Sequence, residues 1–536
     1  MPFALTLAQN LTPIAVRLNQ VGYRTGDSKT AIVCSRPKHT DKIFHLHDDQ
    51  GREVFTGRLS KDKGRYLAFN HHYLADFSKF QATGKFTLAV NGAVSPQFTI
   101  ANDVFKNIPD SLLQFFRVQR CGDNQPYLHA LCHLGDAAKV DGDPSIPEAL
   151  SLTGGWHDAG DYIKFTITTA FTTYLLLLTY QDHPNLIPDR DGNGRSDLLD
   201  EAVVGLDWLL KANYAPGKVI HQVQSLQDHN VGWRLPDKDT LDHRRIAYFR
   251  PSKAVYGSVA AALALGNQVL YQQSSEDYAG RLLNSAKDIW NAAQTDIPDS
   301  ACGPDSMYFD QTANDNLALA AVELCYAEGD EAYLDTAKAL LNRFDKVFWL
   351  SWGDVAGLAW GRLGELYQGG FKKLYEALEF FDKTAGKNPF GYPLENFPWG
   401  SSSLQLGTAL LGIMYQDITG SDRFNGLVIR QRDYILGANS YGVSFIGGWG
   451  TEFPRHFHSQ VGRLSGQPLP GAVAEGLVDA KIFFKSGIKL AYKDRFEEFQ
   501  TKIAVYHDDY EDYLTNEPTI CGNALALYVF AGEADR

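Results

Sequence analysis

Residues 154–180 read GGWHDAGDYIKFTITTAFTTYLLLLTY, a glycine-rich loop that leads directly into a long apolar segment. The loop carries two aspartates three positions apart, Asp158 and Asp161, with small residues between them. Two carboxyl groups at one junction between a loop and a helix can point at one locus, where each raises the proton affinity of the other or both hold one water molecule. An aspartate that caps the following helix is the simpler interpretation, and it stays open at this point.

Helical periodicity extends over most of the chain after Asn102. Apolar residues recur at i, i+3, i+4 and i+7 in residues 255–271, 316–327, 334–344, 374–383 and 404–417. Before Asn102 the chain consists of short alternating segments between turn residues, such as 30–34, 43–46 and 85–90, which is typical of a small β-sandwich. We therefore expect a β-sandwich in residues 1–103 and a helical domain in residues 104–536.

Composition and charge exclude several classes of function. The chain has 536 residues, too many for one small domain, and 50 basic against 63 acidic residues give a net charge of −13. It has no Lys/Arg-rich run that could neutralise phosphates, so we expect no nucleic-acid partner and no anionic membrane partner. Its apolar stretches fall short of the roughly 20 residues that span a bilayer.

The N-terminus and the cysteines favour a cytoplasmic location. Residues 1–10 lack the charged region of a secretory signal, since the first basic residue is Arg17. Six cysteines are spread over the whole length without a CxxC pair, which is typical of buried thiols in a reducing compartment.

A second acidic segment lies near the C-terminus. Residues 506–518 read YHDDYEDYLTNEP and precede a predicted helix over 519–530. Three tyrosines between the acids indicate that the segment packs against other residues. Carboxyl groups on different loops among aromatic side chains are suited to glycoside hydrolysis, which needs one acid with a raised pKa and one ionised base.

These two segments resemble the signatures of glycoside hydrolase family 9. GGWHDAGDY is similar to the aspartate signature of that family, and the segment from Asp508 to Glu517 resembles its C-terminal glutamate signature. VRLNQVGY at 16–23 resembles the opening of the immunoglobulin-like module that precedes many of its catalytic domains, and FFRVQRCG at 115–122 and ILGAN at 435–439 extend the similarity. The resemblance implies a mainly α protein, with an immunoglobulin-like β-sandwich before an (α/α)6 barrel.

The resemblance also implies roles for individual residues. Asp161 would be the catalytic base, Asp158 would help to hold the nucleophilic water, and Glu517 would be the general acid of an inverting reaction that needs no cofactor. Further candidates for contact with a sugar lie in the same loops or in loops rich in Gly, Pro and charged residues: Trp156, His157, Tyr162, Trp399, Trp449, His458, Asp508 and Asp512. We expect Trp208, Trp290 and Trp349, on helical stretches, to belong to the core, and lone histidines such as His133 and His229 to bind no zinc.

Departures from the family pattern bear on the substrate. When the chain is matched to the family pattern without gaps, four positions carry a different kind of residue. Gln460 stands where the family usually has an arginine, and Tyr510 stands where it has a basic residue. Gly522 stands where it has an aromatic residue, and Cys521 stands where it has an acid. A site with fewer cations that keeps its acids would favour a cationic sugar. We therefore expect an exo-β-D-glucosaminidase that acts on chitosan-type disaccharides and short oligosaccharides.

Other functions stay open. The first alternative is a cello-oligosaccharide β-glucosidase or an endo-β-1,4-glucanase, the commoner activity of the family. The second is a non-catalytic carbohydrate-binding protein, which would be expected to lack Asp161 or Glu517. A lyase or a terpenoid-cyclase-like enzyme is a third possibility that we do not prefer.

The segment from 189 to 201 resembles a calcium-binding loop. It places oxygen ligands at Asp189, Asp191, Asn193, Asp197 and Asp200. A structural calcium ion is one interpretation, and ordinary turns followed by an aspartate cap are the other. The sequence does not decide between a monomer and a homodimer.

Overall fold

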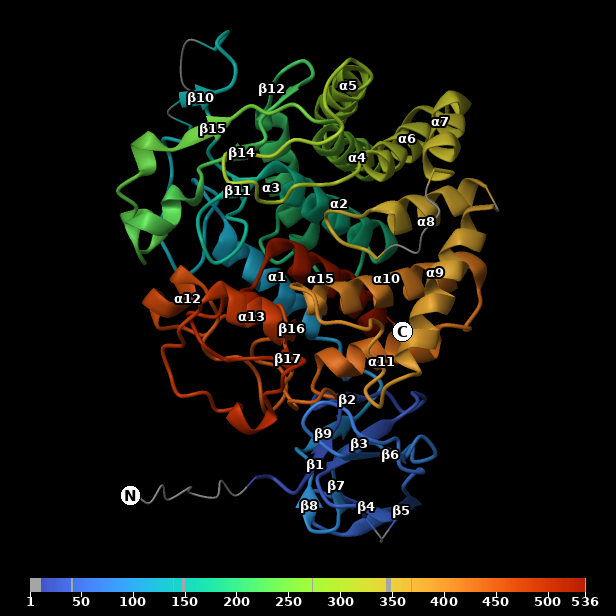
Figure 1. The fold of residues 1–536 in the computed structure, drawn as a ribbon. Helices are drawn as coiled ribbons and strands as arrows, with labels where there is room; N and C mark the ends of the chain where they lie inside the picture. Colours follow the sequence, from blue (N-terminus) through green and yellow to red (C-terminus); the bar gives the residue numbers. More distant parts are fainter. Residues whose placement is uncertain are drawn as a thin grey trace.

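The computed structural model describes residues 11–39, 42–137, 139–146, 150–271, 273–343, 349–367 and 369–535. It contains a small β-domain and a larger helical domain (Figure 1). Residues 1–10, for which we expect no secretory signal, lie outside the described residues.

The N-terminal domain is a sandwich of two sheets. One sheet has the strand order β1-β3-β6, and the other has the order β2-β9-β7-β4-β5 with β8 beside β7. Alternate residues such as Phe44, Leu46, Phe86 and Leu88 point into a separate core between the sheets. The strands are β1 Ile14–Arg17, β2 Gly22–Tyr23, β3 Thr30–Ser35, β4 Ile43–Asp48, β5 Glu53–Arg58, β6 His71–Asp76, β7 Gly84–Val90, β8 Ala93–Val94 and β9 Phe98–Ile100.

Six helices of the described chain form the inner ring of the helical domain. They are α2 Thr166–Asp182, α4 Lys253–Leu270, α6 Asn314–Glu328, α8 Ala356–Leu366, α10 Ser401–Thr419 and α15 Ile520–Asp535. Each contacts the next, and α15 returns to contact α2, so the ring closes. These helices are buried on nearly every side, because their outer faces are covered by a second layer of helices.

The outer layer alternates with the inner ring along the chain and completes the (α/α)6 barrel. Its helices are amphipathic, as in α5, where a buried stripe faces inward and polar residues face water. They are α1 Ile108–Gln119, α3 Asp197–Ala212, α5 Glu276–Ala293, α7 Glu331–Leu341, α9 Gly369–Ala385 and α11 Asn425–Ile435. The predicted fold class is therefore confirmed. Our proposed division at 103/104 falls between β9 and α1.

Long connections at one end of the barrel carry short elements. They include a small sheet of β10 Lys139–Asp141, β15 Ile246–Tyr248, β14 Gln222–Val223 and β11 Lys164–Phe165. The other short strands are β12 Asn213–Ala215, β13 Lys218–Val219, β16 Val478–Asp479 and β17 Ala504–Val505. The remaining helical turns are η1 Leu226–Val231, η2 Pro236–Lys238, η3 Asp242–Arg244, α12 Gln460–Ser465, α13 Ala480–Ser486, η4 Glu497–Phe499 and α14 Tyr513–Asn516.

Two of the segments quoted for the family resemblance join the domains. Gln20 of the VRLNQVGY segment donates its backbone N–H to the oxygen of Leu436, in the ILGAN segment, at 2.9 Å. Asn19 Nδ2 donates to Asp433 Oδ1 at 2.8 Å. The sandwich is thereby hydrogen-bonded to the end of α11.

A buried ion network reinforces this junction. The fully buried Arg432 guanidinium lies 2.9 Å from Asp27 of the sandwich and 2.5 Å from Glu533 of α15. Arg24 of the sandwich also reaches Glu533, at 2.8 Å. The arginine charge compensates buried carboxylates from both domains.

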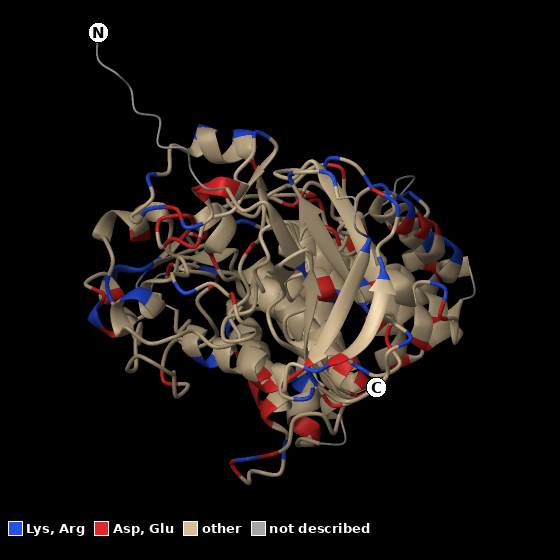
Figure 2. Ribbon diagram, turned by 90° about the horizontal axis from the view of Figure 1, so that it is seen from below, with Lys and Arg blue, Asp and Glu red and all other residues tan. Residues whose placement is uncertain are grey.

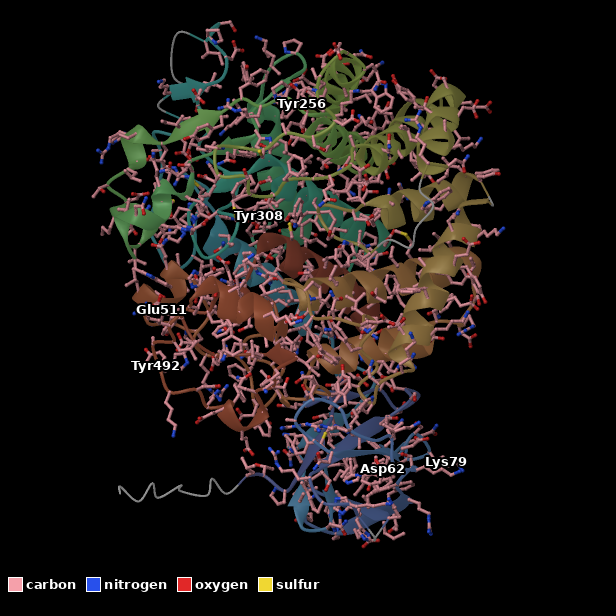
Figure 3. The ribbon with its side chains drawn as sticks, in the orientation of Figure 1. Asp62, Lys79, Tyr256, Tyr308, Tyr492 and Glu511 are labelled. Carbon is pink, nitrogen blue, oxygen red and sulfur yellow. The ribbon has the colours of Figure 1, made fainter. Side chains whose placement is uncertain are left out.

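Charged residues are intermixed over the rest of the molecule. Figure 2 shows Lys/Arg and Asp/Glu side by side on many of the outer helices and loops. Figure 3 places Asp62 and Lys79 on the sandwich, and Tyr308 within the helical domain. A search of the described residues finds no helix with the length and apolar character needed to span a membrane.

The ion network yields a prediction about stability. We expect Arg432→Ala to lower the free energy of unfolding by about 3–5 kcal/mol, because it removes the fully buried counter-charge that Asp27, Asp433 and Glu533 share. Arg423→Ala is the control, since it removes an arginine whose side chain is 45% exposed in its pair with Asp382 and should cost about 1 kcal/mol or less. Urea unfolding curves of both variants measure the difference, and equal losses would contradict the role of the network.

Candidate active site

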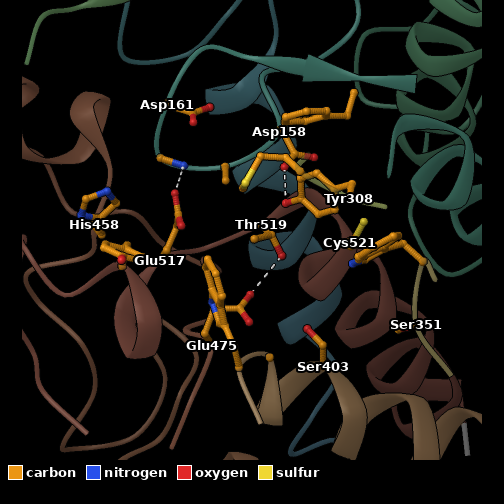
Figure 4. A pocket seen from close by; sticks show the side chains of 18 of the residues that line it. Asp158, Asp161, Tyr308, Ser351, Ser403, His458, Glu475, Glu517, Thr519 and Cys521 are labelled. Carbon is orange, nitrogen blue, oxygen red and sulfur yellow. Dashed lines mark hydrogen bonds between the residues drawn. The ribbon is translucent and has the colours of Figure 1, made fainter. Parts of the chain in front are cut away.

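A cavity of about 780 Å³ opens at the end of the barrel that carries the long connections. The lining comes from the connections that precede the inner helices. Asp158 and Asp161 precede α2, His229 and Trp233 precede α4, Tyr308 precedes α6, Trp352 precedes α8, Trp399 precedes α10 and Glu517 precedes α15. Segments far apart in the sequence therefore meet at one locus (Figure 4).

Gly160 brings the first acidic loop against the last one. A Cβ atom at this position would lie 2.2 Å from the backbone oxygen of His458 and 3.0 Å from Glu517 Oε1, so only glycine fits without displacement. The Gly160 N–H donates to Glu517 Oε1 at 2.9 Å, and its oxygen accepts from Gln460 N at 3.1 Å. The loop that carries Asp158 and Asp161 is thereby fixed beside Glu517.

Glu517 is the acid with the most strongly raised pKa in this loop pair. Desolvation raises the pKa of its carboxyl well above the usual range, and the neighbouring Asp161 carboxyl raises it further. The N–H of Gly160 opposes the shift by donating to the ionised form. The environment therefore favours a protonated Glu517.

Asp158 lies deeper than Glu517 and is held on both sides. Its Oδ1 accepts from the Thr168 hydroxyl, and its Oδ2 accepts from the Tyr308 hydroxyl, each at 2.5 Å. The side chain is 2% exposed, and burial raises its pKa to about 7. Two donors thus fix the orientation of this carboxyl at the cavity wall.

Asp161 faces the cavity with a histidine beside it. His229 Nε2 lies 2.8 Å from Asp161 Oδ2. The hydrogen bond with the Asp161 carboxylate is the largest cause that raises the pKa of His229. A protonated His229 places a positive charge next to Asp161, which the lone-histidine interpretation of the sequence did not anticipate.

Other predicted contact residues also line the cavity. Trp399 is 44% exposed, and His458 is held by a 2.5 Å contact between Nδ1 and the oxygen of Tyr510. Burial lowers the pKa of His458, so its neutral form is favoured. Trp349, which we expected in the core, is 40% exposed and lines the cavity together with Trp352.

Glu475 is a fourth acid in the cavity, and we did not anticipate it from the sequence. Glu475 follows α10 in the chain but lies beside the first turn of that helix, where its backbone oxygen accepts a hydrogen bond from Ser402 N at 2.9 Å. Its Oε1 accepts from the Thr519 hydroxyl at 3.3 Å, and burial raises its pKa to about 7. Its position in an apolar stretch, GAVAEGLV, was the available signal.

Six predicted contact residues do not line the cavity, which corrects our prediction for them. Trp156 is buried beneath the loop and donates to Glu201 at 2.8 Å, while Tyr162 packs against His157. Trp449 packs on the hydrophobic core. The other three support neighbouring groups, as described next for Asp508, Asp512 and His157.

Asp508 and Asp512 stabilise the backbone of the second acidic segment and of the loop beside it. Asp508 accepts from the backbone N–H groups of Arg455 and His456 and pairs with Arg495 at 3.1 Å. Asp512 caps α14, the turn that ends just before Glu517. Both carboxylates therefore hold the chain that presents Glu517, and neither lines the cavity.

His157 belongs to a buried cluster with Cys121, Cys132 and His133. The ligand atoms of these four residues lie within 4.8 Å of one another, and His133 Nδ1 is 3.1 Å from His157 Nε2. Two thiols and two imidazoles are the donor set of a tetrahedral zinc site. His133 Nε2 also contacts Asp239 Oδ2 at 3.0 Å, the outer contact that orients a metal-binding histidine.

The predicted calcium loop does not present a free ligand set. Asp197 is paired with Arg117 at 3.0 Å and with Arg190 at 3.2 Å, and Asp200 is paired with Arg195 at 2.9 Å. Asp189 accepts backbone N–H groups within its own turn, and Asn193 bridges Asp191 and Asp200. These contacts fit the turn-and-helix alternative better than a calcium site.

Two family models match the chain. The model "Glycosyl hydrolase family 9" matches residues 105–530, and "Cellulase N-terminal ig-like domain" matches residues 12–95. Together they cover most of both domains.

Curated relatives match nearly the whole chain. Endoglucanase C of Cellulomonas fimi is 27% identical over 97% of this chain, which spans 52% of that relative. A cellodextrinase of Butyrivibrio fibrisolvens is 26% identical, with 96% of this chain and 99% of the relative covered. The xyloglucan-specific endo-beta-1,4-glucanase BoGH9A of Bacteroides ovatus is 26% identical, with 97% and 94% covered.

Solved structures share the architecture. A metagenome-derived glycoside hydrolase family 9 endoglucanase superposes with a TM-score of 0.84 at 26% identity, covering 98% of this chain and 99% of its own. AaCel9A in complex with a cellobiose-like isofagomine superposes with a TM-score of 0.83 at 25% identity, covering 97% and 100%.

These names overturn our first functional prediction. The relatives are named endoglucanases, a cellodextrinase and a xyloglucan-specific endoglucanase, so the prediction of an exo-β-D-glucosaminidase is wrong and the glucan-directed alternative is better supported. The enzyme class is confirmed, since the match of the family model covers nearly the whole barrel. The chain is an inverting glycoside hydrolase and belongs to glycosyl hydrolase family 9.

Proposed function

We propose that this enzyme hydrolyses β-1,4-glucosidic bonds in cello-oligosaccharides and soluble β-1,4-glucan chains. The observation that carries the proposal is the contact between the two acidic loops, in which the Gly160 N–H holds Glu517 beside Asp158 and Asp161 in one cavity. The names of the relatives support glucan as the substrate, and the cellodextrinase supports short chains.

The proposed chemistry assigns one role to each of three carboxyl groups. Protonated Glu517 donates its proton to the glycosidic oxygen of the leaving sugar. Ionised Asp161 takes a proton from a water molecule, which attacks the anomeric carbon from the opposite face and inverts the configuration. Asp158, oriented by Thr168 and Tyr308, helps to hold that water.

Aromatic side chains supply the surface on which sugar rings can lie. Trp233, Trp352 and Trp399 line the cavity from three different connections. Sugar rings expose apolar C–H faces, so the flat ring of a tryptophan can bury them while the hydroxyls remain free for polar contacts. We propose that Trp399 and His458 contact the substrate, as expected from the sequence.

The buried Cys/His cluster fits a structural zinc ion and not a catalytic one. Cys121, Cys132, His133 and His157 would hold the ion outside the cavity lining, and when bound it would cross-link the segment before the acidic loop to the loop itself. Asp239, which contacts His133, also pairs with Arg234, and Arg234 pairs with Asp228 beneath the loop. The cytoplasmic location stays a prediction, and the choice between a monomer and a homodimer stays open.

Removal of either proposed proton-transfer group should abolish turnover. We expect Glu517→Gln and Asp161→Asn each to reduce kcat on cellotetraose by at least about 1000-fold, because the proton to the leaving group or from the water is lost. Glu511→Gln, an acid on the same segment paired with Arg463, is the control. NMR of the first products should show inverted configuration in the wild type, and near-normal activity of Glu517→Gln would refute its role.

The raised pKa of Glu517 makes stability depend on pH in a defined direction. In the unfolded chain Glu517 has the ordinary glutamate pKa of about 4.3, whereas in the folded protein it keeps its proton to higher pH. As pH rises above about 4.3, ionisation stabilises the unfolded state first, so the free energy of unfolding falls until the pH reaches the folded-state pKa. Glu517→Gln cannot ionise, so we expect it to be more stable than the wild type at pH 8, with a difference in the free energy of unfolding that shrinks toward pH 4. Thermal unfolding at both pH values tests this, and a pH-independent difference would contradict it.

The zinc proposal predicts bound metal. We expect about one equivalent of zinc in the purified protein by elemental analysis, and Cys132→Ser should lose the zinc and unfold at a lower temperature. Cys325→Ser, on α6 and outside the cluster, should retain the metal. A metal-free wild type, or a Cys132→Ser variant of unchanged metal content, would refute the site.

A further inference from the structure

Glu475 is a nearly buried acid that the proposed chemistry does not use. Its side chain lines the cavity although the residue is only 7% exposed. Figure 4 shows Asp161, Glu517 and Glu475 in that order from top to bottom, with Thr519 above Glu475 and joined to it by a dashed line. Glu475 also contributes to the raised pKa of Glu517, which places the two carboxyl groups in the same electrostatic environment.

The backbone around Glu475 is fixed to the segment that presents Glu517. Ala474 forms a β-bridge with Pro518, and the N–H of Gly476 donates to the oxygen of Thr515 at 3.1 Å. Gly476 has a φ of +85°, and a Cβ atom there would lie 2.4 Å from Ser402 Oγ. The chain can therefore turn at this point only with glycine, and Glu475 is held at one position relative to Glu517.

The carboxyl of Glu475 has hydrogen-bonding capacity left for a ligand. The 3.3 Å contact from Thr519 Oγ1 is its one side-chain hydrogen bond among the described residues, whereas a carboxylate can accept about four. The described residues that line the cavity include neither Lys nor Arg. A nearly buried carboxyl with one hydrogen bond and no lysine or arginine beside it is costly unless a ligand supplies donors.

Two hydroxyl groups, those of Ser403 and Thr519, line the same cavity as Glu475. Ser403 Oγ and Thr519 Oγ1 would lie 3.0 Å and 3.2 Å from a Cβ atom at Gly522. Both distances are shorter than ordinary van der Waals contact, so the two hydroxyls can lie this close to α15 because position 522 is glycine. Glu475, Thr519 and Ser403 thus form a polar patch on an otherwise largely aromatic wall.

We propose that Glu475, with Thr519 and Ser403, binds hydroxyl groups of the sugar ring next to the scissile bond and so determines which rings the site accepts. The inference rests on the proposed glucan hydrolysis, because it assigns a specificity residue to that same site. A site built to bind a substrate hydroxyl rejects analogues that lack it, since its buried polar groups are then left without partners.

The test compares the wild type with Glu475→Ala on cellobiose and on a set of monodeoxy cellobioses. We expect the wild type to lose about 10- to 100-fold in kcat/KM on at least one deoxy analogue. Glu475→Ala should lose a similar factor on cellobiose itself and should no longer distinguish that analogue. Glu475→Gln, which keeps the volume, covers the case in which the alanine variant fails to fold. Glu376→Gln, an exposed acid on α9, should behave as the wild type.

A second measurement separates this inference from the proposed function. Calorimetric titration of cellobiose into Glu517→Gln, with and without Glu475→Gln, reports binding without turnover. If the wild type hydrolyses cellobiose and the Glu475 variants keep its discrimination, the inference is overturned and the function stands. If the wild type hydrolyses no glucan, the function is wrong, and weaker cellobiose binding with Glu475→Gln would still support the inference. Equal binding in the two titrations would overturn the inference.

Discussion

The contact of α15 with α2 closes the ring of inner helices, and the candidate site depends on that closure. Asp158 and Asp161 stand just before α2, and Glu517 stands just before α15. The two acidic loops are separated by most of the barrel along the chain, and only a closed ring makes their helices neighbours. The Gly160 N–H then joins the loops through its 2.9 Å hydrogen bond to Glu517.

Closing the ring also buries these acids, and their desolvation has a cost in free energy. Asp158, Glu475 and Glu517 all have pKa values raised chiefly by desolvation, and among the described residues no Lys or Arg lines the cavity to offset them. Burying carboxyl groups without a lysine or arginine beside them lowers stability, and the same burial raises their proton affinities into the range that suits catalysis near neutral pH. Other interactions offset this loss of stability, among them the buried Arg432 network at the junction between the two domains.

The support of the acidic loop comes from residues that we had considered for sugar contact. Trp156 is buried beneath it, His157 is turned into the Cys/His cluster, and Asp508 and Asp512 brace the opposing segment. These support residues are of the same types, and come from the same loops, as residues that line the cavity, so the sequence alone does not separate the two groups. Whether a given aromatic or acidic side chain points into the cavity is decided by the packing behind the loop.

The sequence by itself determined the class of the fold, the two domains and the acids that we propose for catalysis. Helical periodicity and alternation are local properties, and the GGWHDAGDY and 508–517 segments carry their residues at short, readable spacings. Only the tertiary structure decided that His229 pairs with Asp161, that His133 meets His157, and that Glu475 lies beside Thr519. These pairs join residues from 24 to 68 positions apart, or come from different connections, and their meeting depends on how the helices close the barrel.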